Sequence, residues 1–216
     1  QSNGRMFSYM DFCKEIIHAG ANEFAPAIHG HNEKIHDFLT SVKGSFRETV
    51  KGVENLKMLH QIVITNTVIT SCNYKSLPRI AKLLSRLKVD QFQFAFIHIL
   101  GSAALNSSWI VPKKTDVVRF VKRGLDIGKA SGINVMAEAI PYCIMNEYEA
   151  YVSERYIPDT KVYDHTLVVE DFKKSRMEEG KAKSETCDPC KYNKICEGPW
   201  KEYVGLYGWK EFRPVK

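Results

Sequence analysis

The sequence predicts an α/β fold with a parallel sheet, followed by a small cysteine-rich extension. Between residues 9 and 140, strand-like and helix-like segments alternate at intervals of about 30 to 40 residues, which is the pattern of βαβ units. Such units wind right-handed into a barrel or an open sheet. Near the end of the chain, three cysteines fall within ten residues with the spacing Cys-x2-Cys-x5-Cys.

The composition is that of an ordinary globular protein. Of the 216 residues, 44% are hydrophobic and 26% are charged. The net charge is +6 and the lysines and arginines look spread out, so an anionic ligand is permitted and there is no clear nucleic-acid signal. No stretch reaches the ~20 apolar residues of a membrane span, and no signal peptide is visible. We therefore expect a cytoplasmic protein without a membrane partner.

The first predicted elements are short. Apolar residues at helical spacing predict a helix over residues 9–19, which Gly20 stops. Residues 23–30 form an extended run that contains Pro26, and a polar helix follows over residues 33–39.

The next two elements are stronger. A helix is predicted over residues 45–59, with Ser45 as the N-cap and Glu48 completing a capping box. Residues 61–69 are β-branched almost throughout and predict the clearest strand. A helix is then predicted over 77–87, with Pro78 in its first turn, and a strand over 91–100. A helix over 115–130, capped by Thr115, and a strand over 133–140, which ends at Pro141, complete the first half.

The pattern changes after Cys143. We place a domain boundary near 141–146, which divides the chain into residues 1–142 and 143–216. The second part is predicted to contain a helix over 146–155, a loop over 157–163, a short strand over 167–170, a solvated charged linker over 173–183, and an aromatic tail over 200–216. The aromatic residues of the tail are expected to pack the extension onto the barrel.

The cysteines predict a metal centre. Cys187, Cys190 and Cys196 supply three local thiolates, and Cys143 is the best fourth ligand because it follows a predicted strand end. An iron–sulfur cluster is favoured; zinc, a disulfide and free thiols are the alternatives. Cys13 and Cys72 are expected to stay outside the site.

A second group of candidates lies at the carboxyl ends of the predicted strands, where parallel α/β folds bind ligands. These candidates are Asn3, His29, Asn66, His98 and the loop after Cys143. An asparagine in such a place can equally well satisfy a local turn, and a lone histidine can be structural.

Four stretches together resemble the radical S-adenosylmethionine (radical SAM) enzymes that carry a C-terminal SPASM or twitch extension. They are Ser2-Asn3-Gly4, Ala27-Ile28-His29-Gly30, Asn66-Thr67-Val68-Ile69 with Asn73, and the Cys-x2-Cys-x5-Cys run. The resemblance implies a partial TIM-like β/α barrel in residues 1–142, from the end of the third strand onward. It implies an auxiliary [4Fe–4S] cluster on Cys143, Cys187, Cys190 and Cys196 in residues 143–216.

Parts of the family pattern are absent from this chain. The Cys-x3-Cys-x2-Cys loop and the Gly-Gly-Glu run would both lie upstream of Gln1, so we expect the chain to be the C-terminal part of a longer enzyme. Ala27 stands where relatives often have a serine that holds the cofactor carboxylate, and Pro26 beside it removes a ladder donor.

The resemblance implies a function for the intact protein. A second [4Fe–4S] cluster and S-adenosylmethionine would generate a 5′-deoxyadenosyl radical for hydrogen abstraction, with an external electron donor. Asn3, His29 and Asn66 would bind the cofactor; no catalytic residue is assigned. Many such relatives modify peptide or protein side chains, others act on small molecules, and the sequence does not choose between them. The alternative is a non-catalytic binding module stabilised by zinc or a cluster.

Overall fold

A computed structural model describes residues 1–163 and 168–216. Its described part divides into two compact units. The first comprises Gln1–Ala95 and Arg119–Met136, and the second comprises Phe96–Val118 and Ala137–Lys216. The predicted boundary at 142/143 stays a prediction.

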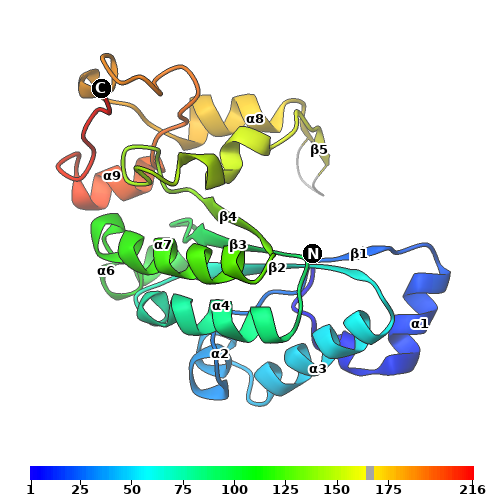
Figure 1. The fold of residues 1–216 in the computed structure, drawn as a ribbon. Coiled ribbons are helices and arrows are strands. Elements are labelled where there is room, and N and C mark those ends of the chain that lie inside the picture. Colours follow the sequence, from blue (N-terminus) through cyan, green and yellow to red (C-terminus); the bar gives the residue numbers. More distant parts are fainter. Residues whose placement is uncertain (164–167) are drawn as a thin grey trace. The chain divides into compact units, whose positions relative to one another are not determined.

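A parallel sheet of four strands, in the order β1-β2-β3-β4, runs through the α/β part of the chain (Figure 1). Its strands are β1 (Glu23–Phe24), β2 (Ile62–Ile69), β3 (Gln91–Phe96) and β4 (Asn134–Glu138). Each strand alternates buried and more exposed residues, as expected where one face packs on helices. The α/β class is confirmed. The strands predicted over 61–69 and 91–100 form β2 and β3, which are neighbours in the sheet, and β3 already ends at Phe96. No closed barrel is formed by the described strands, and the partial TIM-like barrel stays a prediction.

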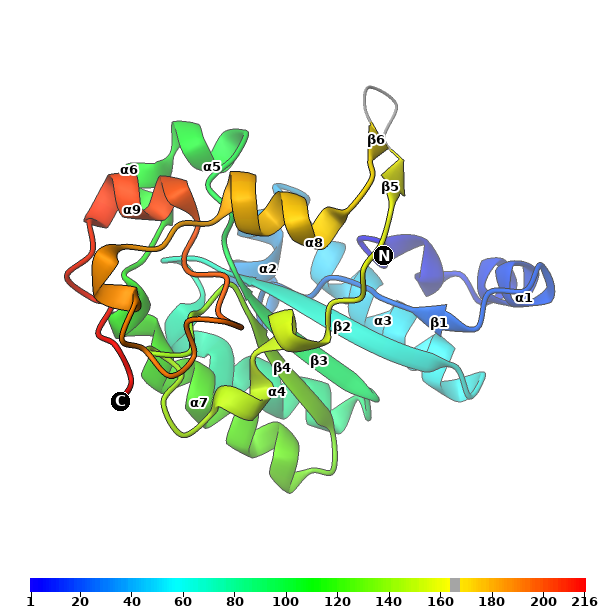
Figure 2. The ribbon, with the colours of Figure 1, turned by 90° about the horizontal axis from the view of Figure 1, so that it is seen from above.

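The helices of the first unit are η1 (Arg5–Ser8), α1 (Met10–His18), α2 (Glu33–Thr40), α3 (Ser45–Met58), η2 (Tyr74–Ser76) and α4 (Leu77–Arg86). Of these, α3 and α4 lie on one side of the sheet (Figure 1), and α1 lies beyond the end of β1 (Figure 2). A longer helix, α7 (Lys114–Ala130), leads from β3 toward β4. Buried apolar side chains of α4, among them Ile80 and Leu84, face the core together with Phe92 and Phe94 of β3.

The predicted capping box of the helix over 45–59 is wrong. Gly44, with φ 86°, is the N-cap, and Ser45 is already the first helical residue. The carboxylate of Asp37 takes the capping role instead, because it accepts hydrogen bonds from the backbone N–H groups of Gly44 (2.6 Å) and Phe46 (2.8 Å). Glu48 is paired with Arg5 at 2.5 Å.

Two other predicted boundaries shift. The strand near residues 23–30 is only two residues long, and an isolated parallel bridge between Ala27 and Asn66 continues it. Helix α7 begins at Lys114, one residue before the predicted cap Thr115, whose N–H donates to Glu211 Oε1 at 2.9 Å.

The second unit has short elements. They are α5 (Ser102–Leu105), α6 (Ser107–Ile110), η3 (Glu149–Tyr151), η4 (Ser153–Tyr156), β5 (Val162–Tyr163), β6 (Val168–Val169), α8 (Phe172–Ser175), the π-helical turn η5 (Arg176–Gly180), η6 (Glu185–Cys187) and α9 (Lys201–Tyr207). Residues predicted as a helix over 146–155 form the 3-10 turns η3 and η4 instead. The predicted loop over 157–163 ends in β5, which pairs antiparallel with β6 (Figure 2). The strand predicted over 167–170 includes β6, and its first residue, Leu167, lies outside the described residues.

Candidate functional site

The four predicted cysteines line one pocket of the second unit. Cys187 ends η6, Cys190 and Cys196 lie in the turns that follow, and Cys143 lies in the turn after β4. The turns are closed by backbone hydrogen bonds from Cys190 to Cys187 (3.0 Å) and from Cys196 to Tyr192 (2.8 Å). Cys13 and Cys72 are not among the residues that line this pocket. All six cysteines are free, so the disulfide alternative is not formed in this structure.

The surroundings of Cys143 and Cys196 favour the neutral thiol. Burial, with smaller contributions from the neighbouring Cys196, Cys190 and Cys187, raises the pKa of Cys143 to about 12. Burial also raises the pKa of Cys196. A cation bound among the sulfurs would supply the charge that stabilises thiolates here.

The pocket has walls and hydrogen bonds suited to a soft metal group. Tyr142, Trp209 and Phe212 form part of its lining, and Phe212 is 7% exposed. The backbone N–H groups of Gly198 and Val215 donate to the sulfurs of Cys196 and Cys190, both at 3.4 Å. Within the described part of the chain, no three His, Cys, Asp or Glu side chains are already arranged as ligands for a metal ion. The four thiols and the pocket around them therefore suit a soft metal. The sulfurs would have to move closer together to ligate one.

Gly198 determines the path of the chain after Cys196. Its φ is +84°, and a Cβ atom placed on it would lie 2.0 Å from the carbonyl oxygen of Ala182. This close approach lets Ala182 N–H donate to Pro199 O at 3.0 Å, next to an antiparallel bridge between Lys181 and Trp200. Only glycine readily adopts this φ and, lacking a Cβ atom, lets the Ala182 carbonyl come this close.

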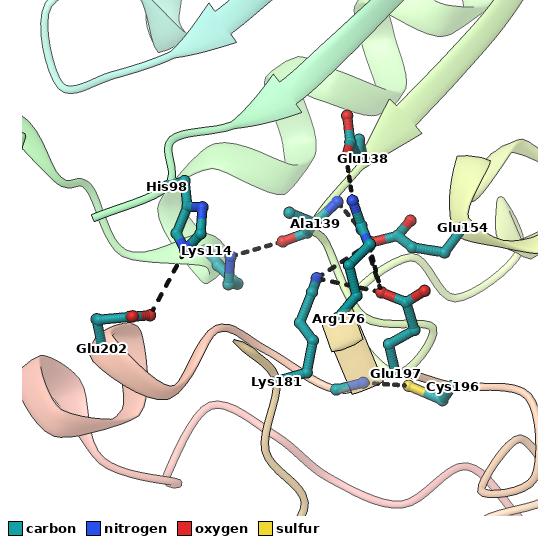
Figure 3. A network of polar contacts seen from close by, with 11 residues as sticks. His98, Lys114, Glu138, Ala139, Glu154, Arg176, Lys181, Cys196, Glu197 and Glu202 are labelled. Atoms are coloured by element: carbon teal, nitrogen blue, oxygen red, sulfur yellow. Dashed lines mark hydrogen bonds and ion pairs between the residues drawn. The ribbon is translucent and has the colours of Figure 1, made fainter. Parts of the chain in front are cut away.

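A cluster of buried charges adjoins Cys196 in sequence and in space (Figure 3). Arg176 donates to Glu138 Oε1 at 2.9 Å and to Glu197 Oε2 at 3.1 Å. Lys181 Nζ lies 3.4 Å from Glu154 Oε1 and 3.7 Å from Glu197 Oε2. We call these five residues, Glu138, Glu154, Arg176, Lys181 and Glu197, the buried charge cluster.

This cluster overturns the prediction that residues 173–183 are a solvated linker. The side chain of Arg176 is 7% exposed and that of Lys181 is fully buried. Their burial is possible because three carboxylates, supplied from three other places in the chain, compensate the two cations. A run of charge in the sequence cannot reveal partners that lie up to 38 residues away.

Glu154 carries free hydrogen-bonding capacity inside the cluster. Its Oε1 accepts from the backbone N–H of Ala139 at 2.7 Å, while its Oε2 has no partner within the described residues. Burial raises the pKa of Glu154, and Lys181 opposes that rise. Glu197 Oε1 and the Trp200 indole N–H are likewise buried and unpartnered in the described part. Buried groups of this kind are commonly satisfied by water or a ligand.

Trp200 joins the buried charge cluster to His98. Its ring stacks on the His98 imidazole with 3.8 Å between centroids, and Lys181 Nζ lies 3.9 Å from its centroid. His98 Nε2 is 3.8 Å from Glu202 Oε2, too far for a hydrogen bond (Figure 3). Burial lowers the pKa of His98, so this contact joins a neutral imidazole to a carboxylate.

Lys114 is a fully buried lysine that the sequence did not single out. Its Nζ donates to Ala139 O at 2.7 Å and lies 3.2 Å from the centroid of the Phe96 ring. Burial holds the pKa of Lys114 well below its usual value. Its backbone N–H donates to the hydroxyl of Tyr203 at 2.8 Å, so the predicted packing role of the aromatic tail includes this lysine. The only sequence feature of Lys114 that could have drawn attention to it is its position directly before the helix predicted over 115–130.

The predicted cofactor residues lie in the first unit, on adjoining parallel segments. The prediction that Asn66 stands at the carboxyl end of its strand is wrong, because it lies inside β2 (Ile62–Ile69), three residues before the end of that strand. Ser2 pairs with Pro26, and Ala27 pairs with Asn66, so Asn3, His29 and Asn66 belong to three neighbouring parallel segments. Asn66 Oδ1 is buried and has no hydrogen-bond partner among the described residues. A group that binds a ligand would have the same appearance in a structure without that ligand. Asn3 Oδ1 accepts from Arg5 N–H at 3.1 Å in a local turn.

His29 is held from several sides. Its Nδ1 accepts from Val68 N–H at 3.3 Å, its carbonyl accepts from Asn73 Nδ2 at 2.9 Å, and its N–H donates to His36 Nδ1 at 3.1 Å. Burial lowers the pKa of His29, which keeps the imidazole neutral. The Nδ1 contact leaves Nε2 as the protonated nitrogen.

The chain was compared with known protein families, curated proteins and solved structures. No family model matches the chain, and no curated protein matches it. Among solved structures, SuiB of Streptococcus suis bound to S-adenosylmethionine shares 14% identity and a TM-score of 0.55, over 90% of this chain and 53% of that one. SuiB bound to the precursor peptide SuiA gives 12% identity and a TM-score of 0.54, over 90% and 52%.

At this identity the likeness concerns the fold. The chain spans about half the length of the SuiB structure bound to S-adenosylmethionine. No described helix has the length and apolar content to cross a membrane. The chain therefore has a parallel α/β fold like that of a protein solved with S-adenosylmethionine bound.

Proposed function

We propose that the chain is the C-terminal part of a radical SAM enzyme that acts on a peptide, with an auxiliary [4Fe–4S] cluster on Cys143, Cys187, Cys190 and Cys196. The single observation that carries the proposal is that these four cysteines, three chosen from their spacing and Cys143 from its place after a predicted strand, line one pocket. The fold likeness to SuiB supports it independently, because that protein was solved both with S-adenosylmethionine and with a precursor peptide.

The cysteine pocket suits the role of an auxiliary site. Four thiolates would give each iron of a cubane one protein ligand and leave none open to substrate. The N–H groups of Gly198 and Val215 aim at two of the sulfurs and would spread their negative charge. Trp209 and Phe212 keep solvent from part of the pocket.

Asn66 is the strongest of the proposed cofactor residues. Its buried, unpartnered Oδ1, on a residue within β2, suits an amino or hydroxyl donor of S-adenosylmethionine. His29 would orient the cofactor with its Nε2–H, since its Nδ1 is already used by Val68. Asn3 would contribute through its backbone N–H, because its side-chain oxygen accepts from Arg5 and its carbonyl accepts from Thr49 Oγ1 at 3.0 Å. S-adenosylmethionine, when bound beside a reduced cluster, supplies the radical chemistry; an external donor supplies the electron.

The test is anaerobic reconstitution with iron and sulfide, followed by metal analysis and an electronic spectrum. The protein should bind about four irons and four sulfides at this site, and single Cys→Ala variants at 143, 187, 190 and 196 should each lose most of them. Cys72→Ala is the matched control, because Cys72 is also a half-buried cysteine in a turn.

Two results would contradict the proposal. If Cys143→Ala binds as much iron as the parent with the same spectrum, the fourth ligand is not Cys143. If the site takes up zinc alone, the protein is the binding module of the alternative prediction rather than a carrier of an auxiliary cluster.

A further inference from the structure

The positive charge of the chain is concentrated in one stretch. Residues 55–89 contain six lysines and arginines and no aspartate or glutamate, and this excess equals the net charge of the whole protein, +6. The composition taken over the full length hid this, because acids and bases balance elsewhere. The stretch includes α4, whose sequence from Leu77 to Arg86 has no acidic residue.

Helix α4 presents its cations on one side. Arg79, Lys82 and Arg86 are three and four residues apart, a spacing that places them on the same face of a helix. All three are exposed, while Ile80 and Leu84 are buried on the opposite side. Within the described residues none of the three forms an ion pair. Arg79 donates to the neutral hydroxyl of Ser76 at 3.3 Å.

These cations line an open groove of about 490 Å³ on the first unit. Its other walls include His31, Ser85 of α4 and Ser131, which follows α7. The groove thus combines unpaired cations with an imidazole, which is the chemistry that receives carboxylates. The hydroxyls of Ser85 and Ser131 are already used, because they donate to Ala81 O and Ile127 O, each at 2.9 Å.

His31 provides a second, independent sign of a ligand. Its Nε2 lies 3.2 Å from the amide nitrogen of Asn32, a donor, so the ring proton belongs on Nδ1. Nδ1 is buried and has no acceptor among the described residues. The His31 ring therefore offers a hydrogen bond that nothing in the described chain receives.

We propose that this groove binds an acidic segment of the peptide substrate, a reading that rests on the proposed function. Arg79 and Arg86 are seven residues apart on the helix, or about 10 Å. An extended peptide presents side chains on one side at every second residue, ~7 Å apart, so two or three acidic residues can reach the row of cations. A single phosphate could engage one part of this row at a time.

The experiment measures binding of a fluorescein-labelled peptide of alternating glutamate and serine to the purified protein, by anisotropy. The glutamine–serine peptide is the uncharged control. The acidic peptide should bind at low salt, and its affinity should weaken as salt shortens the Debye length to about 8 Å near 0.15 M. The triple variant Arg79→Glu/Lys82→Glu/Arg86→Glu should weaken binding at least about tenfold. His31→Ala should weaken it by a smaller factor.

The matched control is Lys34→Glu/Lys43→Glu/Lys51→Glu, which changes the net charge equally at exposed positions outside the groove. If both triple variants bind alike, or if the glutamine–serine peptide binds as well as the acidic one, the proposal is wrong. Preference for inorganic phosphate or for a single-stranded oligonucleotide over the acidic peptide would also overturn it. Circular dichroism verifies folding of each variant. No cluster or cofactor is needed for this measurement, so its failure is distinguishable from failure of the proposed function.

Discussion

Arg176 donates two hydrogen bonds to a single carboxylate oxygen of Glu197, from Nε at 3.2 Å and from Nη2 at 3.1 Å. Glu197 directly follows Cys196, whose sulfur accepts from Gly198 N–H. The pair therefore links the buried charge cluster to the cysteine pocket through two consecutive residues. Loss of the guanidinium would leave Glu138, Glu154 and Glu197 with Lys181 as their one remaining cation in the cluster.

Arg176→Met should destabilise the protein by about 3–5 kcal/mol, because removing one partner leaves buried charge uncompensated. Urea unfolding measures this as a fall in the midpoint with an unchanged slope. Arg47→Met is the control, since Arg47 pairs with Glu33 at 2.5 Å but its side chain is 77% exposed. That variant should unfold at nearly the same urea concentration as the parent, because an exposed ion pair contributes little to stability. Equal losses in the two variants would mean that Arg176 does not hold the cluster together.

Gly198→Ala should lower the unfolding temperature by several degrees. A positive φ costs an alanine roughly 1–2 kcal/mol, and the added Cβ at 2.0 Å from Ala182 O would force the backbone apart. Gly205→Ala is the matched control, because it lies within α9 (Lys201–Tyr207) and its added Cβ would meet nothing within 4 Å. The control should be neutral or stabilising by up to about 1 kcal/mol, as helix propensity requires. A Gly198→Ala variant that melts with the parent would show that the turn can relax.

His36 should make the stability of the first unit depend on pH. Its side chain is 1% exposed, and burial lowers its pKa to about 4, with His29 adding to the effect. Below pH 6.5 the unfolded chain takes up a proton at this histidine that the folded chain refuses until about pH 4. The folded state therefore loses up to roughly 3 kcal/mol from this group as the pH falls through that window, and loses nothing from it above pH 7.

His36→Asn removes the titration while Asn can still accept the hydrogen bond that His29 N–H donates to Nδ1. The variant should be less stable than the parent at pH 7, because a buried ring that stacks on His29 is lost. Urea unfolding at pH 7, 6, 5 and 4.5 should show this gap narrowing as the pH falls. A gap that stays constant would mean that His36 is not kept neutral by the fold.

Local sequence patterns predicted much of the fold. The β-branched run at 61–69 became β2, and the amphipathic segment at 77–87 became α4 with Pro78 in its first turn. These elements could be predicted because burial of one face repeats with the period of the strand or the helix. The choice of four cysteines also came from the sequence, because Cys187, Cys190 and Cys196 are closely spaced and Cys143 follows a predicted strand, and all four line one pocket.

Partners that are distant in sequence could not be predicted in this way. Asp37 replaced Ser45 as the cap of α3 because the fold brings the end of α2 to the start of α3. Asn3 looked like a cofactor ligand, and its side-chain oxygen closes a local turn. The sequence alone determined the alternation of strands and helices and the set of candidate thiols. Tertiary structure decided which charges are buried, because the free energy of a buried Arg176 or Lys181 depends on carboxylates that only folding brings within 4 Å.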